Sequence, residues 1–302
     1  MVRLRRRAGV GPAAHSRDIV ISVIVPVYNG APILPTTLPA FAALEGVGEV
    51  VVVDDGSTDS TAVLLADTPG LRVVSLKANQ GRSAARNAGA RAARGDVLVF
   101  FDADAEPHSR SALALAEAMG PDGVASVARL DPVPSHPDDP FQDYVCHHPR
   151  GPARSLRPGV AVAWRFFLSG ACAVRRSAFE AAGQFPTEVP YGEDVALACR
   201  LARAHPDGLR LADTTVRLHD LGDLRLALTH AAAFGRAAAA FEEPCPSGAL
   251  DRFRRARALG WAAPLAAGVL RAGVRVLPAG PGRRRAVRYL LASTALSAAC
   301  RA

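Results

Sequence analysis

Two aspartates, Asp102 and Asp104, are separated by one residue and follow a short apolar run at residues 96–101. Carboxylate oxygens suit hard cations such as Mg²⁺ or Mn²⁺, which neutralise polyanions such as the diphosphate of a nucleotide sugar. Because side chains alternate along an extended strand, we expect both carboxylates on one side. We assign Asp104 to the metal and Asp102 to the nucleotide sugar, through its ribose or a metal-bound water. A solvated acidic turn would show the same two aspartates.

Three residues that could hold a nucleoside follow two other apolar runs. Asp55 comes after residues 50–53 and can accept the ring N–H of a uracil-like base. Pro26 and Tyr28 come at the end of the run that begins at residue 19, and they can pack against that base. Asp-Gly and Asn-Gly pairs also form tight turns in any protein, so each motif alone is weak evidence for a nucleotide.

The segment of residues 79–87, NQGRSAARN, predicts a turn that runs into a helix. Arg82 stands at the helix start and Arg86 one turn later, where guanidinium groups and a helix N-terminus can bind a phosphate or sugar hydroxyls. We assign Arg82 to the nucleotide sugar. For Arg86 the alternative is a place on a solvated helix face.

Another helix is expected to open at Glu193 and Asp194, directly after Gly192. Carboxylates at a helix N-terminus are ordinary dipole partners, which gives both acids a structural explanation. An inverting transfer needs a carboxylate that takes the proton of the acceptor hydroxyl, and we assign this role to Asp194. His219 follows a later apolar run and either completes the metal shell or is structural.

The elements that must position these residues alternate between strand and helix. Strands are predicted at residues 19–25, 50–53, 72–76 and 96–101, with Pro26 as the stop of the first. Helices are predicted between them at residues 36–44, 59–66 and 83–93. This alternation predicts an α/β fold with a mostly parallel, Rossmann-like sheet, whose ligand lies beyond the carboxyl ends of the strands.

The second part of the chain is less regular. Residues 120–158 are rich in Pro, Asp, His and Arg and predict a long acceptor-side loop with one strand at 124–128. Later elements are predicted at residues 166–174, 177–182 and 215–218. We therefore expect a basic arm at 1–18 and one domain at 19–243, with a nucleotide-sugar half at 19–119 and an acceptor half at 120–243. Residues 244–302 are expected to form an Arg-rich, amphipathic helical tail.

The charge distribution separates the two ends from the domain. The net charge is +8, yet residues 1–18 and 245–302 are strongly basic and the segment between them is acidic. Arg supplies nearly all of the basic residues, which a GC-rich genome also favours, so we predict no nucleic-acid partner. The five cysteines are scattered and never spaced as C-x-x-C, which indicates a reducing, cytoplasmic compartment.

Two apolar runs of twelve residues, at 259–270 and 289–300, are flanked by Arg. Both are too short to span a bilayer, and their composition is typical of helices that lie in the membrane interface. We expect peripheral attachment to the inner face of the cell membrane, where a polyprenyl-linked acceptor or another cell-envelope glycan precursor is presented. The alternative is a helical pair packed on the domain.

Taken in order, the motifs PVYN, VDDGSTD, NQGRSAARNAG, FFDADAEP, SGACAVRRSAFEAAGQF and GED with a following RL resemble the family 2 glycosyltransferases of GT-A fold. The resemblance covers about residues 19–219. It implies a nucleoside site at Pro26, Tyr28 and Asp55, a metal and diphosphate site at Asp102 and Asp104, and a single inverting displacement. The Q-x-x-R-W motif of the processive synthases is absent after GED, which favours transfer of one sugar over polymer synthesis.

Two other classes of protein stay open on the sequence. A nucleotidyltransferase of similar sheet topology would need a Gly- and Lys-rich loop early in the chain, and this chain has only Lys77. A non-catalytic nucleotide-sugar-binding protein would have no use for both the D-x-D and the GED motif.

Overall fold

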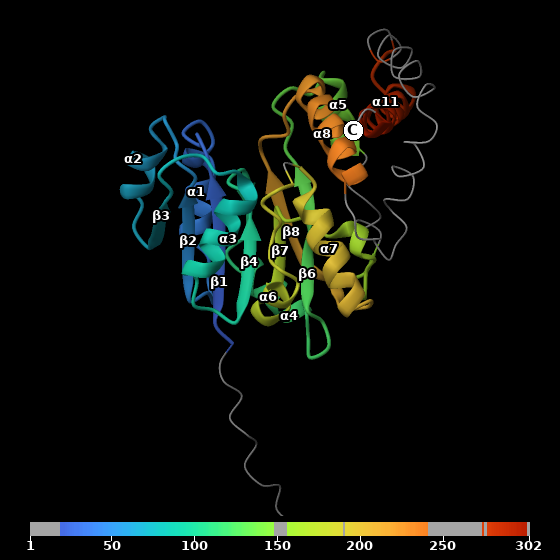
Figure 1. Ribbon diagram of the computed structural model, residues 1–302. Helices are drawn as coiled ribbons and strands as arrows, with labels where there is room; N and C mark the ends of the chain where they lie inside the picture. The colour runs from blue at the N-terminus through green and yellow to red at the C-terminus, as the bar shows by residue number, and fades with distance from the viewer. Residues whose placement is uncertain (1–18, 148–155, 190, 241–273, 275–276, 301–302) are drawn as a thin grey trace, which may run out of the picture.

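The computed structural model describes residues 19–147, 156–189, 191–240, 274 and 277–300 (Figure 1). Its centre is an eight-stranded sheet in the order β3-β2-β1-β4-β7-β6-β8-β5. The strands are β1 (Ile21–Val27), β2 (Glu49–Asp54), β3 (Leu71–Ser75), β4 (Val97–Phe101), β5 (Ala105–Glu106), β6 (Ala125–Pro132), β7 (Ala171–Arg175) and β8 (Leu209–Leu218). The helices are α1 (Leu34–Ala42), α2 (Thr61–Ala66), α3 (Arg82–Ala92), α4 (Ser111–Ala118), α5 (Pro140–His147), the 3-10 helix η2 (Trp164–Phe166), α6 (Arg176–Ala181), α7 (Glu193–Ala204), α8 (Leu224–Ala240) and α11 (Pro281–Cys300).

Most strands of this sheet run in one direction. β1 pairs in parallel with both β2 and β4, β2 with β3, and β6 with β8. β7 is antiparallel to β4 and β6, and β5 is antiparallel to β8. The carboxyl ends of the parallel strands therefore meet at one edge, and the prediction of a mostly parallel sheet flanked by helices is confirmed.

Two apolar layers cover the two faces of the sheet. On one face α3, α6 and α7 pack on alternate residues of the central strands, including Ile24, Val53 and Phe100. On the other face α1 and α4 pack on the intervening residues, such as Val25 and Val99. Because every second residue of a strand points to the same face, runs that are apolar throughout are expected for strands buried on both sides.

Several predicted elements differ from those of the structure. Pro26 does not stop the first strand but lies inside β1, where it faces Val53 of the neighbouring strand. Residues 120–158 are not a long loop, because they contain the whole of β6 and α5. The regular element predicted at residues 166–174 contains the end of η2 and most of the five-residue β7, and α4 and α8 were not predicted. These two helices are rich in Ala and Leu, and such segments carry weak start and stop signals, which explains the omissions.

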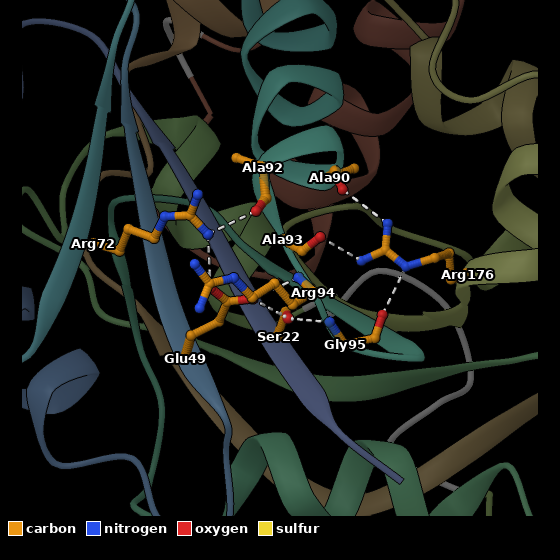
Figure 2. A network of polar contacts seen from close by, with 9 residues as sticks. All are labelled: Ser22, Glu49, Arg72, Ala90, Ala92, Ala93, Arg94, Gly95 and Arg176. Carbon is orange, nitrogen blue, oxygen red and sulfur yellow. Dashed lines mark hydrogen bonds and ion pairs between the residues drawn. The ribbon is translucent and has the colours of Figure 1, made fainter.

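A polar network ties α3 to the edge of the sheet opposite the candidate site (Figure 2). The Arg176 guanidinium donates to three backbone carbonyls, two at the C-terminal end of α3 and one at Gly95 just beyond it, at 2.7 to 3.0 Å. Arg72 donates to a fourth carbonyl and to Glu49, and Ser22 links Glu49 to the amide of Gly95. Because the last carbonyls of a helix have no partner within it, these arginines complete its hydrogen bonding and favour its dipole. They anchor α3 by its distal end.

The C-terminal helix α11 packs beside α8 and α5, beyond the carboxyl ends of β6 and β8 (Figure 1). A side chain at Gly235 of α8 would overlap the carbonyl oxygen of Ala295, so the two helix backbones are in close contact. Asp143 of α5 forms ion pairs with Arg283 and Arg284 at 3.4 and 3.6 Å. The predicted interfacial run 289–300 thus has one face packed on the protein. The run 259–270 lies outside the described residues.

Two further expectations concern membranes and cysteines. None of the helices in the described ranges is both long and apolar enough to cross a bilayer. Cys146 and Cys172 carry free thiols, whereas Cys199 is disulfide-bonded. The sequence analysis did not predict this disulfide. Spacing along the chain carries no information on a pairing that only folding creates.

Candidate active site

A pocket of about 780 Å³ opens at the carboxyl ends of β1, β2 and β4, beside the first turn of α3. It brings together six of the eight residues assigned to the site from the sequence. They are Pro26, Tyr28, Asp55, Arg82, Asp102 and Asp104. Asp194 and His219 are not among the residues that line it. The predicted convergence of separate strand ends on one site is thus observed.

The two aspartates of the D-x-D motif belong to a tight turn and not to a strand. β4 ends at Phe101, and the amide of Ala105 donates to the carbonyl of Asp102 at 3.0 Å. The turn is held from both sides, because the Asp102 amide donates to the Gly170 carbonyl and the His219 amide donates to the Asp104 carbonyl. Both aspartates line the pocket as predicted, but the turn and not strand alternation puts them there.

Gly170 leaves room for the Asp102 carboxylate. A Cβ atom at this position would lie 2.6 Å from Asp102 Oδ2, which is far inside van der Waals contact. Asp102 therefore approaches the backbone at the start of β7 more closely than any residue with a side chain would allow.

We expect Gly170→Ala to displace the Asp102 carboxylate and to lower turnover by roughly 10- to 100-fold, since small misplacements at a reacting centre carry losses of that size. Initial rates of nucleotide release at saturating donor are the measurement. Gly282→Ala is the control at an unrelated helix, because a Cβ there would meet nothing within 4 Å and the backbone is not in the left-handed region. Equal rates for Gly170→Ala and the unaltered protein would show that the Asp102 position is not critical.

The Asp104 carboxyl is surrounded by features that disfavour its charge. Burial, followed by the neighbouring charges of Asp102 and Asp220, raises the pKa of Asp104 to about 7. Two or three carboxylates that repel one another in a partly buried turn are a donor set that suits a hard divalent cation, because the cation replaces repulsion by attraction.

We expect Asp104→Asn to stabilise the protein in EDTA at pH 8. The folded pKa of Asp104 lies above its unfolded value, so the folded state binds more protons between about pH 4 and pH 7 and loses stability as the pH rises through that window. The amide removes this loss, and the gain relative to the parent should grow by about 1–2 kcal/mol from pH 5 to pH 8. Urea unfolding at both pH values measures it, with the exposed Asp213→Asn as a control. A constant difference would contradict the argument.

A buried arginine joins the D-x-D turn to the helix that carries the expected base. Arg86 is 2% exposed and donates from Nη2 to Asp102 Oδ1 at 2.6 Å and from Nη1 to Glu193 Oε1 at 2.8 Å. Burial alone lowers its pKa, but the Asp102 and Glu193 carboxylates outweigh this and raise the pKa of Arg86 above its ordinary value. Arg86 is thus a charged bridge, and the alternative of a solvated helix face is wrong.

Asp55 supports the loop that forms one wall of the pocket. It is 2% exposed, and its two carboxylate oxygens accept hydrogen bonds from the amides of Gln80 and Gly81 at 2.8 and 2.9 Å. Each oxygen has a second lone pair, so Asp55 can still accept a donor from a ligand. Tyr28 is 47% exposed on the same side of the pocket and offers a free aromatic surface.

The GED segment lies against α3 and α8. The Arg82 guanidinium stands over the Tyr191 ring at 4.9 Å, and the His230 ring of α8 stacks on the same tyrosine at 4.7 Å. α7 begins at Glu193, as predicted, which places Asp194 in its first turn. Asp194 is half-buried, whereas Glu193 is buried in its contact with Arg86. Of the two acids, Asp194 is the one whose carboxylate is not fixed by that bridge.

His219 lies at the end of β8, and its ring contacts a carboxylate. Its Nε2 atom is 2.5 Å from Glu106 Oε2, and Arg217 donates to the same oxygen at 2.9 Å. Metal-binding histidines commonly use one ring nitrogen for such a carboxylate and the other for the ion. Within the described ranges, no three His, Cys, Asp or Glu side chains are grouped closely enough to hold an ion by themselves.

Two buried polar atoms at the pocket have no hydrogen-bond partner. They are the Ser83 hydroxyl in the first turn of α3 and the Nε atom of Arg86. An unpaired buried donor costs about 1–3 kcal/mol. Such groups are expected where a ligand supplies the missing acceptor. The sequence pointed to this segment, but it contained no signal that Ser83 is buried.

Comparison with known proteins identifies the family to which this chain is similar. Residues 22–183 match the model described as glycosyl transferase family 2. The chain is 39% identical over 98 residues to the succinoglycan biosynthesis protein ExoO of Rhizobium meliloti, covering 32% of this chain and 28% of that protein. It is 39% identical over 118 residues to the undecaprenyl-phosphate 4-deoxy-4-formamido-L-arabinose transferase of Pseudomonas fluorescens, covering 35% of each. The chain thus spans about a third of the length of these relatives.

Solved structures share the fold at low sequence identity. The mannosyltransferase PcManGT of Pyrobaculum calidifontis, in complex with GDP-Man and Mn²⁺, superposes with a TM-score of 0.62 and 22% identity, over 94% of this chain and 86% of that chain. The S. aureus protein TarS 1-349, in complex with UDP-GlcNAc, gives a TM-score of 0.53 and 20% identity, over 78% of this chain and 70% of that chain. These similarities establish the GT-A fold.

Proposed function

This chain belongs to the family 2 glycosyltransferases, and from that membership we propose that it moves one sugar from a nucleotide-diphosphate sugar to an acceptor hydroxyl with inversion. The observation that carries the proposal is that one pocket is lined by the D-x-D turn, by Arg82 and by the residues predicted to hold the nucleoside. Such a pocket can hold both ends of a nucleotide sugar at once.

The donor would lie across this pocket from the nucleoside to the sugar. Pro26 and Tyr28 provide a surface for the base, and Asp55 offers an acceptor for its ring N–H. Arg82 lies at the N-terminus of α3, where its charge and the helix dipole favour the diphosphate. PcManGT and TarS were solved with GDP-Man and UDP-GlcNAc respectively, which supports a nucleotide sugar as the donor class without choosing the nucleotide.

The metal would be Mg²⁺ or Mn²⁺, held by Asp104 and assisted by Asp102, with His219 completing the shell. The raised pKa of Asp104 and its acidic neighbours support a bound cation at this turn. When bound, the cation stabilises the negative charge that develops on the leaving diphosphate. Glu106 would orient the His219 ring through the contact described above.

Asp194 would act as the general base. The acceptor oxygen attacks the anomeric carbon as the bond from that carbon to the diphosphate oxygen breaks, and the electron pair of this bond leaves with the diphosphate. Asp194 takes the proton of the acceptor hydroxyl in the same step. Glu193 is a weaker candidate, because Arg86 already holds its carboxylate at 2.8 Å.

A donor screen tests the proposed function. The full chain is incubated with Mn²⁺ or Mg²⁺ and with UDP-, GDP- or dTDP-sugars, and the released nucleoside diphosphate is measured. Release from one donor class supports a transferase. Retention of a nucleotide sugar on ultrafiltration without any turnover would indicate a binding protein. Release of pyrophosphate from a sugar phosphate and a nucleoside triphosphate would indicate a nucleotidyltransferase instead.

The acceptor is proposed to be lipid-linked and presented at the inner face of the membrane. One relative is named as a transferase to undecaprenyl phosphate and another as a succinoglycan biosynthesis protein, and both names concern the cell envelope. α11 buries one face on α8, and its opposite face presents Arg285, Arg288 and Tyr289, of which Tyr289 is 62% exposed. Residues at these spacings lie together on a helix, and arginine with tyrosine suits an anionic lipid surface.

We expect the double variant Arg285→Gln, Arg288→Gln to bind anionic vesicles on the order of 10-fold more weakly, since each arginine near the headgroups contributes about 1 kcal/mol. Co-sedimentation with anionic and neutral liposomes at low and high salt measures the effect. The matched control is Arg91→Gln, Arg110→Gln, which removes two exposed arginines of other helices and loops. Equal sedimentation of both variants, or no sedimentation of the unaltered chain, would count against membrane attachment and would leave the transferase proposal intact.

A further inference from the structure

A second pocket, also of about 780 Å³, lies between the segment after β6 and the start of α8. Its polar groups come from Ser135, His136, Asp220, Asp223, Arg225 and Thr229. The buried side chain of Gln142 holds its two walls together. Gln142 accepts a hydrogen bond from the amide of His136 at 2.8 Å and donates to the carbonyl of Gly222 at 2.9 Å. The pocket is thus bounded by two fixed segments.

Asp220 connects this second pocket to the D-x-D turn. The Asp220 side chain lines the pocket, whereas its backbone forms a hydrogen bond with the Asp104 carboxyl and its charge acts on the same group. His219, the preceding residue, is joined to Asp104 through its own amide. The segment of His219 and Asp220 therefore connects the D-x-D turn of the first pocket to the lining of the second.

The charges of the second pocket select between two kinds of acceptor. The lining of the second pocket contains two aspartates, Asp220 and Asp223, and one arginine, Arg225. A phosphate monoester carries nearly two negative charges near neutral pH and would be repelled by this lining. Hydroxyl, imidazole, carboxylate and guanidinium groups around an open cavity instead match the many donors and acceptors of a sugar ring.

From this juxtaposition we propose that the second pocket binds a neutral saccharide, whose hydroxyl is the acceptor of the transfer. The inference rests on the proposed function and specifies its acceptor. A saccharide acceptor also explains why the reaction would need a general base. A sugar hydroxyl must lose its proton to Asp194 as its oxygen bonds to the anomeric carbon, whereas a phosphate oxygen is already ionised and needs no base. A lipid carrier is compatible with the proposal only when it bears a sugar.

The test fills the pocket and compares two acceptor classes. Thr229 lies in α8 and Thr68 in the bend that follows α2. Both donate their hydroxyls to the carbonyl four residues earlier, but only Thr229 lines the second pocket. Thr229→Trp and the control Thr68→Trp are assayed as full chains with donor and Mn²⁺. The acceptors are a panel of methyl glycosides and, separately, farnesyl monophosphate. Slow release of nucleotide by water alone reports on the donor site.

We expect transfer to at least one methyl glycoside, with a KM that rises ~10-fold or more in Thr229→Trp and is unchanged in Thr68→Trp. Release by water should stay the same in both variants. His136→Ala, on the other wall, should raise the KM in the same direction by a smaller factor. Transfer to farnesyl monophosphate but to no glycoside, or an unchanged KM in Thr229→Trp, would overturn the proposal.

If the proposed function itself were wrong, no nucleotide sugar would release its nucleotide, and this result differs from the outcomes that would overturn the saccharide proposal. In that case saturation-transfer NMR with the same methyl glycosides decides on the pocket alone. Contacts that are lost in Thr229→Trp and kept in Thr68→Trp would support a saccharide site, and the absence of contacts in the unaltered chain would refute it.

Discussion

Asp104→Ala is expected to abolish transfer, and EDTA is expected to do the same to the unaltered protein. The substitution removes a carboxylate from the turn that is suited to a hard cation, so the leaving diphosphate loses its charge compensation. Loss of metal assistance is worth several kcal/mol at the transition state, which corresponds to a decrease of at least ~10²-fold in kcat. Nucleotide release at saturating donor, with added Mn²⁺, measures the effect.

The controls separate loss of metal from loss of fold. Excess Mn²⁺ or Mg²⁺ should restore the EDTA-treated protein but not Asp104→Ala. Asp213→Ala removes a carboxylate whose side chain is 84% exposed, and this variant should keep full activity. The stability gain expected for Asp104→Asn gives a second check, because a misfolded variant would be less stable and not more. Full activity of the unaltered protein in excess EDTA would contradict the metal assignment.

Asp194→Asn is expected to keep donor binding and to lower turnover by ~10²- to 10⁴-fold, the contribution usually found for a general base. The amide preserves the size of the side chain and removes its ability to accept a proton. Calorimetric binding of the nucleoside diphosphate, together with the rate of transfer, distinguishes the two effects. A large decrease in kcat with an unchanged dissociation constant is the expected pattern.

Glu193 provides the comparison for this experiment. Its carboxylate is bonded to the buried Arg86, which also holds Asp102. Glu193→Gln should therefore weaken the position of Asp102 and change both donor binding and turnover. If Asp194→Asn instead turned over at a near-normal rate and Glu193→Gln did not, the base would be Glu193 and the Arg86 bridge would have to open during the reaction.

The sequence alone determined the fold class and most of the residues that line the first pocket. Apolar runs that end in polar motifs predicted parallel strands, and the carboxyl ends of parallel strands must meet at one edge because of the direction of the chain. Pro26, Tyr28, Asp55, Asp102 and Asp104 could therefore be placed together without coordinates. These predictions rest on local patterns of a few residues, which a sequence displays directly.

Only the tertiary structure decided what those residues contact. The Arg86–Glu193 bridge joins residues 107 positions apart, and the His219–Glu106 contact joins residues 113 positions apart. Burial converts Arg86 from a surface residue into a charged bridge, and burial together with the charges of Asp102 and Asp220 raises the pKa of Asp104 to about 7.

The second pocket and the packing of α11 were likewise decided by the tertiary structure. The second pocket exists because β6, α5 and α8 fold together at one end of the sheet, and α11 is packed and not free because its apolar face fits α8. No single segment of the sequence displays either feature. Periodicity reports which face of an element is apolar, but the partner that covers this face is chosen by the whole chain, through contacts between segments that are distant in sequence.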